Sequence, residues 1–377
     1  MTDNNEPDYR FKPIFGYLAG LIVFALGVTL LITLDKGWDR SDLPEISRPP
    51  LKYAEPPSVR NIPTKIRQAK AAGLYYPADP KELYKIIDQL LGLDKPLGLA
   101  NVRSVLVPHA GYIYSGDVAA AAFRQMTKDF NRVFILAANH SSEADFSGVS
   151  LPDVSHYQIP GADIPLSAVV DDLLKNTLFV QEPVAHTKYM IEVELPFLYS
   201  LRNRPAKPDF TIVPMILGRM DDTSIAQLAK ILHSYDDGHS QFVFSVDLSH
   251  FYTDRKARQL DSHTIQSILS RDTASLARTT ADGPQVLLTM VELAELSGWE
   301  STMLKYKNSG EVSGDRNKVV GYAAIAFHEP FSLSSKEQKE LLTLARNTIK
   351  QFLHEGDYDN ADPALLDKHK ILKIPRG

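Results

Sequence analysis

The chain of 377 residues contains no cysteine. This absence excludes disulfide bonds, thiolate metal sites and cysteine nucleophiles, so His, Asp and Glu remain as the strong metal ligands. An excess of basic charge is also lacking, because the formal net charge is -5, and we therefore expect no nucleic-acid partner. Phosphate-binding Gly-rich loops and the Gly-x-Ser-x-Gly elbow of serine hydrolases are missing as well.

One long apolar run stands near the N-terminus. Residues 13–34 carry no charge and are flanked by Arg10 and Lys12 before and by Asp35 and Lys36 after. The length suits the roughly 20 residues that span a bilayer as a helix. A cleaved signal peptide is the main alternative, but no small-residue cleavage site follows. The run predicts a transmembrane anchor and a single-pass membrane protein, with the side of the body undecided because basic residues lie on both flanks.

The rest of the chain divides by composition. Apolar runs of four to seven residues alternate with amphipathic helical patterns, which indicates a three-layer α/β domain with a mostly parallel sheet covered by helices on both faces. A proline-rich spacer precedes this domain and an amphipathic helix follows it. The predicted organisation is a tail at 1–12, the anchor at 13–34, a linker at 35–61, the α/β domain at 62–332 and a C-terminal helix and tail at 333–377.

Periodicity also places the elements of the α/β domain. We expect strands over 104–107, 132–138, 210–215, 242–246, 302–306 and 319–327. Helices are expected over 80–91, 116–126, 167–175, 192–201, 223–235, 254–269, 272–277 and 284–296.

Three of the predicted strands run directly into polar residues. His109 and His140 each follow a buried strand pattern, and Asp247 and His250 follow a third. In an open parallel sheet, functional groups gather outside the carboxyl ends of the strands. One such histidine is more often structural than functional, but three strand ends of this kind favour a metal or proton-transfer site.

The order of several short motifs resembles the Memo family, the B component of the AmmeMemoRadiSam system. The segments that carry this resemblance are Ala72 to Pro80, His109-Ala-Gly-Tyr112, Ala138-Asn-His140-Ser141, Glu192 to Phe197, Asp247-Leu-Ser-His250 and Asn308 to Ala324. They extend from about residue 62 to residue 327. The C-terminal segment is similar to the start of an Amme domain, so an Amme protein and a radical SAM protein are implied as pathway partners.

The resemblance implies a metal centre. The Memo family is similar in fold to LigB-type extradiol dioxygenases, in which two histidines and a late-loop carboxylate hold Fe(II). His109 and His140 would supply the imidazoles, and Glu311 is the expected third ligand, with Asp315 next. Some Memo proteins use a cysteine near this position, and this chain has none. Fe(II) is the expected cofactor, with other divalent metals possible.

The same resemblance suggests catalytic roles for three further residues. His250 would transfer protons, and Asp247 would orient it or a metal ligand, although a turn residue is an equal alternative for Asp247. Tyr189 stands where relatives commonly carry a histidine, while His186 lies three residues upstream. A phenol and an imidazole differ in pKa by more than about three units, so substrate handling could differ here.

Three functions remain open on the sequence. The first is metal-dependent redox or ring-opening chemistry on a small molecule, as in a dioxygenase-like oxidoreductase. The second is a non-catalytic module that binds a peptide or protein partner at the same site. The third is a metal-dependent hydrolase, in which Asp247 could bridge to a metal.

Overall fold

A computed structural model of the protein describes residues 58–330, together with Lys339, Leu342, Thr343 and Arg346. The predicted membrane helix at 13–34 lies outside the described residues, as do most of the linker and of the Amme-like C-terminal segment. In the part of the chain that is described, no helix is both long and apolar enough to cross a bilayer. Nothing among the described residues therefore supports the predicted single-pass anchor or the membrane location that came with it.

The described residues form one large sheet and one small sheet. The large sheet has nine strands in the order β10-β12-β2-β9-β3-β8-β4-β7, and β11 pairs with β12 outside this path. Its strands are β2 (Val102–Val107), β3 (Arg132–Ala138), β4 (Val149–Ser150), β7 (Phe179–Val180), β8 (Thr211–Leu217), β9 (Ser240–Ser245), β10 (His250–Tyr252), β11 (Glu300–Asn308) and β12 (Val319–His328). The small sheet joins β1 (Ile66–Arg67), β5 (His156–Ile159) and β6 (Ala162–Pro165).

The large sheet is mixed, which corrects the expectation of a mostly parallel sheet. The four central strands β2, β9, β3 and β8 run parallel. Strand β12 pairs antiparallel with β2, β10 and β11, and β4 pairs antiparallel with β8. Of these antiparallel pairs, only β11–β12 joins strands that are consecutive in the chain, through a short connection over residues 309–318. The other pairs join strands that are far apart in the sequence.

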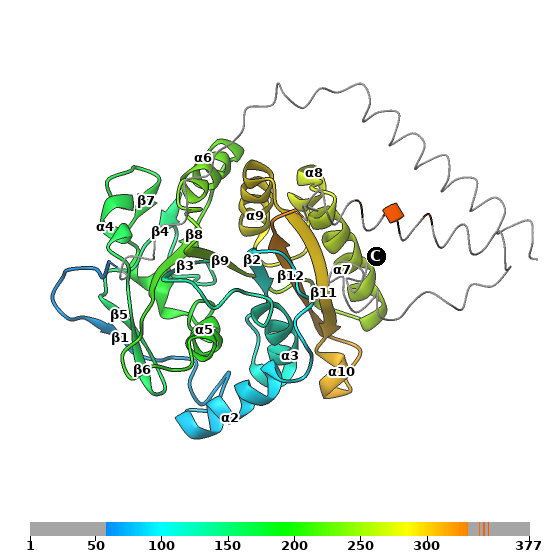
Figure 1. Cartoon of the computed structure of the whole chain (residues 1–377), viewed down its shortest axis with the longest axis horizontal. Helices are drawn as coiled ribbons and strands as arrows, with labels where there is room; N and C mark the ends of the chain where they lie inside the picture. The colour runs from blue at the N-terminus through cyan, green and yellow to red at the C-terminus, as the bar shows by residue number, and fades with distance from the viewer. Residues whose placement is uncertain (1–57, 331–338, 340–341, 344–345, 347–377) are drawn as a thin grey trace, which may run out of the picture. The chain divides into compact units, whose positions relative to one another are not determined.

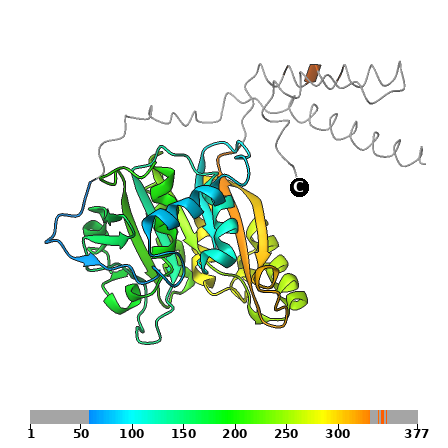
Figure 2. The same cartoon turned by 90° about the horizontal axis from the view of Figure 1, so that it is seen from below.

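Helices cover both faces of the large sheet, as expected for a three-layer α/β domain. In Figures 1 and 2, α2, α3 and α5 lie on one face, and α6, α7, α8 and α9 lie on the other. The helices are α2 (Pro80–Leu91), α3 (Tyr112–Phe123), α4 (Val169–Leu173), α5 (Leu195–Leu201), α6 (Asp222–His233), α7 (Asp254–Leu269), α8 (Thr273–Leu276), α9 (Pro284–Ser297) and α10 (Gly310–Ser313), with 3-10 turns η2 (Pro183–Thr187) and η3 (Glu192–Glu194).

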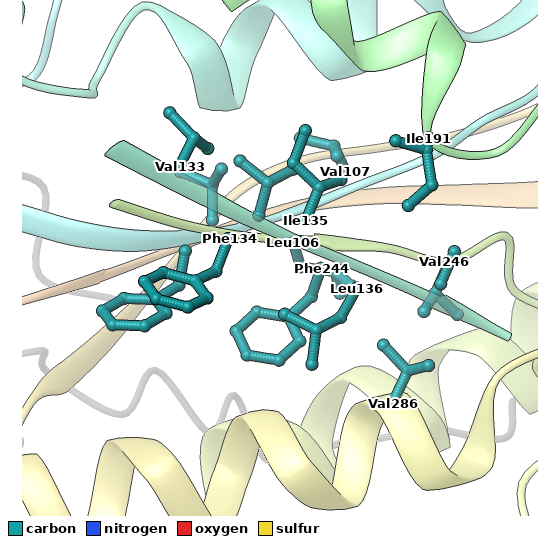
Figure 3. Packing of buried hydrophobic residues seen from close by; sticks show 14 of the residues in the cluster. Leu106, Val107, Val133, Phe134, Ile135, Leu136, Ile191, Phe244, Val246 and Val286 are labelled. Atoms are coloured by element: carbon teal, nitrogen blue, oxygen red, sulfur yellow. The ribbon is translucent and has the colours of Figure 1, made fainter. Parts of the chain in front are cut away.

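The central strands are apolar on both faces. In Figure 3, Val133 and Ile135 of β3 point to one face, while Phe134 and Leu136 point to the other, where Val286 of α9 lies. All of them are fully buried. Alternate side chains of a strand point to opposite faces, so a strand buried on both sides needs an unbroken apolar run.

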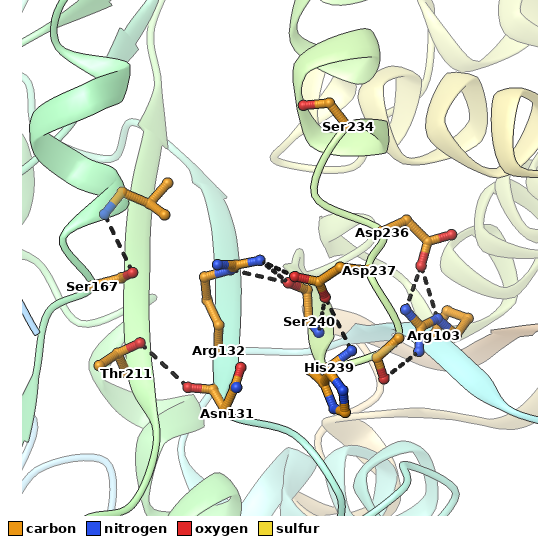
Figure 4. Close-up of polar contacts among 12 residues, drawn as sticks. Arg103, Asn131, Arg132, Ser167, Thr211, Ser234, Asp236, Asp237, His239 and Ser240 are labelled. Atoms are coloured by element: carbon orange, nitrogen blue, oxygen red, sulfur yellow. Dashed lines mark hydrogen bonds and ion pairs between the residues drawn. The ribbon is translucent and has the colours of Figure 1, made fainter. Parts of the chain in front are cut away.

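Ion pairs and hydrogen bonds of two arginines connect the amino ends of the central strands. Figure 4 shows Arg132, the first residue of β3, against Asp237 and Ser240, and Arg103 of β2 against Asp236. The guanidinium groups thus join the starts of β2, β3 and β9. The opposite edge of the sheet, at the carboxyl ends of these strands, is thus left free of these ion pairs.

The loop that carries His250 is held by a buried carboxylate of α7. Asp261 accepts hydrogen bonds from the backbone N–H of Ser249, at 2.9 Å, and from the hydroxyl of Tyr306, at 2.7 Å. Its carboxylate lies directly against the Cα of Gly321 in β12, in the space that any side chain at this position would occupy. Only glycine therefore allows β12 and α7 to approach this closely.

Gly321→Ala should destabilise the protein by about 1–3 kcal/mol, because the added methyl group collides with Asp261 and the crowded core must shift. Chemical denaturation measures this loss. Gly111→Ala is the matched control, since its φ of -58° suits alanine and the nearest atom is at 3.5 Å. Equal stability of the two variants would contradict the argument.

Candidate metal centre

Each of three central strands delivers a polar side chain two residues after its last residue. Strand β2 ends at Val107 and leads to His109, β3 ends at Ala138 and leads to His140, and β9 ends at Ser245 and leads to Asp247. Strand β9 lies between β2 and β3. The two histidines therefore come from the strands on either side of β9.

The two predicted histidines meet at this edge together with Asp282. The Nε2 atoms of His109 and His140 lie 3.2 Å apart. Oδ2 of Asp282 lies 3.0 Å from Nε2 of His109 and 3.2 Å from Nε2 of His140. Together these three residues form a group with the spacing of metal ligands.

The spacing of these donor atoms suits one ion. Ligand atoms at ~2.1 Å from a metal and at right angles to each other lie about 3.0 Å apart. The separations in this protein are 3.0 to 3.2 Å. The side chain of His109 is 2% exposed, whereas that of His140 is 25% exposed. An ion held here would therefore be open to solvent on the side of His140.

Asp282 was not among the residues predicted from the sequence. It lies in the loop that leads into α9, where Asp282-Gly283-Pro284 reads as an ordinary helix-start turn. Glu311, the expected third ligand, instead forms an ion pair with Arg258 at 3.0 Å and accepts from the N–H of Asn308.

The second expected carboxylate lies elsewhere too. Asp315 is exposed and accepts from the N–H of Asn317. Neither Glu311 nor Asp315 belongs to a metal-ligand group among the described residues. The structure thus brings a different carboxylate to the histidine pair.

Asp247 links the parts of the site. One of its oxygens accepts from the backbone N–H of His109 at 2.9 Å, and its own N–H donates to Oδ1 of Asp282 at 3.2 Å. The N–H of Asp282 in turn donates to the carbonyl of Asp247 at 3.1 Å. These bonds fix the Asp282 loop to the end of β9.

His250 approaches the same carboxylate from β10. Its Nδ1–H donates to the carbonyl of Leu248 at 2.9 Å, which leaves Nε2 without a proton in the neutral ring. That Nε2 lies 4.0 Å from Oδ2 of Asp282. Asp247, His250 and Asp282 form a second group with metal-ligand spacing, so Asp282 belongs to both groups.

Tyr189 and His186 lie in different surroundings. The ring of Tyr189 stacks on Tyr75 at 3.8 Å and meets His109 edge-on at 6.0 Å, so it borders the site. Burial raises its pKa above the usual tyrosine range. His186 is buried between Tyr157 and Ser150, and burial lowers its pKa to about 3. His186 is therefore a neutral structural residue away from the histidine pair.

The site concentrates negative charge in a buried place. Burial alone would lower the pKa of His109, but the carboxylates of Asp247 and Asp282 outweigh it and raise this pKa to about 10. Burial raises the pKa of Asp247. Burial also works against ionised Asp282, but His109 and His140 lower its pKa well below the usual value. The ionised Asp282 thus favours a positive charge beside it. In the metal-free protein, protonated His109 supplies this charge.

The fold and this site define an α/β protein with a histidine–carboxylate centre at the carboxyl edge of its sheet. The sequence profile of the Memo family, described as Memo-like protein, matches residues 67–326. The chain therefore belongs to the Memo family, and the resemblance seen in its motifs is confirmed.

Two MEMO1 family proteins are similar to this chain over nearly their whole length. A MEMO1 family protein of Methanococcoides burtonii is 34% identical over 272 residues, covering 69% of this chain and 99% of the relative. One of Methanobrevibacter smithii is 32% identical, covering 70% of this chain and 99% of the relative. A solved structure of an uncharacterized protein from Escherichia coli K12 covers 60% of this chain and 99% of that chain, at 9% identity and a TM-score of 0.42.

In the metal-free protein, His109 should titrate near pH 10, and Asp282→Asn should lower the midpoint, because one of the two nearby negative charges that raise this pKa is lost while Asp247 remains. NMR of the histidine ring protons measures both values. Since the folded pKa exceeds the unfolded one, protonated His109 stabilises the fold fully below about pH 6.5 and this stabilisation disappears as pH rises through 10. Asp153→Asn, at the distant Lys65 pair, should leave the midpoint unchanged.

Proposed function

We propose that this protein binds one Fe(II) ion through His109, His140 and Asp282 and performs redox or ring-opening chemistry on a small molecule. The observation that carries the proposal is the meeting of three donor atoms within 3.2 Å at a partly open sheet edge. Two imidazoles and one carboxylate on one side of a metal are the ligand set of non-haem Fe(II) oxygenases. When bound, Fe(II) supplies open positions for substrate or dioxygen.

The residues present fit such an ion in number, spacing and charge. With both histidines neutral, the ionised Asp247 and Asp282 give the site two negative charges, which a divalent cation balances. A buried carboxylate without a positive partner is costly, so this balance favours metal binding. Asp247 accepts a hydrogen bond from the backbone N–H of His109, and its own N–H donates to Asp282, so two of the ligands are held in place before a metal binds.

His250 is proposed as the group that takes a proton from the substrate. Its Nε2 is unprotonated in the neutral ring and faces the site, while Leu248 fixes its orientation. Histidine is the side chain that most often serves as a general base in enzymes. Its side chain is 29% exposed, so a substrate can reach it from solvent.

A metal-dependent hydrolase is the second candidate. The specific observation in its favour is that Asp282 belongs to both metal-ligand groups. A carboxylate shared in this way can bridge two ions about 3.5–4 Å apart, which would activate water between them. In that case His250 and Asp247 would bind the second ion. Metal stoichiometry separates the two candidates.

The full-length protein should bind one Fe(II) under anaerobic conditions, and His109→Ala, His140→Ala and Asp282→Ala should each reduce binding at least tenfold, because each removes one of three ligands. Metal analysis after dialysis measures the stoichiometry. Glu311→Ala is the matched control and should bind like the unmodified protein, since Glu311 pairs with Arg258. Unchanged binding in all three ligand variants would refute the proposed site.

His250→Ala should keep its bound Fe(II) but lose at least about 100-fold in turnover, because the general base is gone while the ligands remain. Oxygen uptake with a catechol as probe substrate measures turnover, and metal analysis measures retention. A fall from two bound ions to one would instead support the hydrolase with a dinuclear site.

A further inference from the structure

A third carboxyl group lies beneath the histidine pair, and neither the ligand set nor the proton-transfer role uses it. Glu194 ends η3 and is 1% exposed. Its Oε1 lies 2.9 Å from Oγ of Ser245, the last residue of β9, which is fully buried. The same Oγ lies 3.0 Å from Nδ1 of His109. Ser245 therefore connects Glu194 to a proposed metal ligand.

The hydroxyl of Ser245 has three neighbours but only one hydrogen. Besides Glu194 and His109, the carbonyl oxygen of Met190 lies 2.9 Å from Oγ. A carbonyl can only accept, so the hydroxyl hydrogen is best used on Met190. The other two contacts are then hydrogen bonds only if His109 Nδ1 and Glu194 each donate a hydrogen to Oγ. An ionised Glu194 would compete with Met190 for one hydrogen and leave a buried acceptor unpaired, at a cost of roughly 1–3 kcal/mol.

We infer that Glu194 is a protonated carboxylic acid that donates to Ser245 and, through Ser245, holds His109 with its proton on Nδ1 and its Nε2 free for a metal. Glu194 is thus a positioning residue for the metal ligand. The inference deepens the proposed function, since it rests on His109 acting as a ligand.

The surroundings of Glu194 favour the neutral form. Burial is the main cause that raises its pKa, to about 8, and the negative charge of Asp247 adds to it. The hydrogen-bond contact with Ser245 and the positive charge of His109, just after β2, oppose this shift. From α3, the hydroxyl of Tyr112 faces the same region and donates to the carbonyl of Val193.

Charge balance agrees with this assignment. A neutral Glu194 leaves Asp247 and Asp282 as the two charges that balance a divalent ion. An ionised Glu194 would add a third negative charge, which would be buried and which a divalent ion would not balance.

The test compares three variants of the full-length protein. Glu194→Gln keeps a neutral donor of the same shape, so its affinity for Co(II), followed by absorption, should stay within about threefold. Glu194→Met and Ser245→Ala remove the donor or its relay and should weaken Co(II) binding about 10–100-fold. The double variant Glu194→Met/Ser245→Ala should be no weaker than Ser245→Ala, because Glu194 acts through Ser245. A loss in Glu194→Gln as large as in Glu194→Met would overturn the inference.

A second measurement does not need a metal. An acid whose pKa is ~4.3 when unfolded and about 8 when folded makes the protein less stable as pH rises between these values. The melting temperature of the metal-free unmodified protein should therefore fall relative to Glu194→Gln from pH 5 to pH 8. A constant difference over this range would show an ionised Glu194 and would overturn the inference. Absence of metal binding together with the expected pH dependence would refute the proposed function alone.

Discussion

The parallel register of β2, β9 and β3 is the constraint on which the site depends. Ser245 of β9 pairs with Val107 of β2 and with Ala137 of β3, so the three strands end at nearly the same level. Each then places a polar residue two positions further on. The packed layers on both faces hold this register, because a slip of one residue would exchange the side chains that pack against the helices on each face.

Burial next decides the chemistry of these groups. A buried carboxylate retains its charge only beside a cation. Asp247 and Asp282 are the two buried carboxylates of the site that need such a cation. In the metal-free protein the compensating proton lies on His109, which explains its raised pKa. A divalent ion would replace that proton. The negative charge of the two carboxylates therefore links the stability of the fold to metal binding.

The antiparallel flank adds His250 to the parallel centre. Strand β12 runs beside β2 and carries β10 on its other side. Asp261 and Gly321 set how closely α7 and β12 approach, and Asp261 also holds the backbone next to His250. The position of a group proposed for proton transfer is therefore set by packing that lies outside the site itself.

Local sequence patterns by themselves predicted most of the helices, the long buried strands and the position of His109 and His140 just after two of those strands. Helices α2 and α7 have the predicted bounds, because amphipathic periodicity and caps are local signals. The short strands β1, β4, β5, β6, β7 and β10 were missed, and the mixed sheet was expected to be mostly parallel, because strand pairing joins residues far apart in the chain. Asp282 shows the same limit: no strand precedes it, and only the packing of α9 on the sheet brings it to His109. Glu311 was expected there from its place in a late loop, but Arg258 holds it elsewhere, since the chain's path decides which carboxylate reaches the histidines.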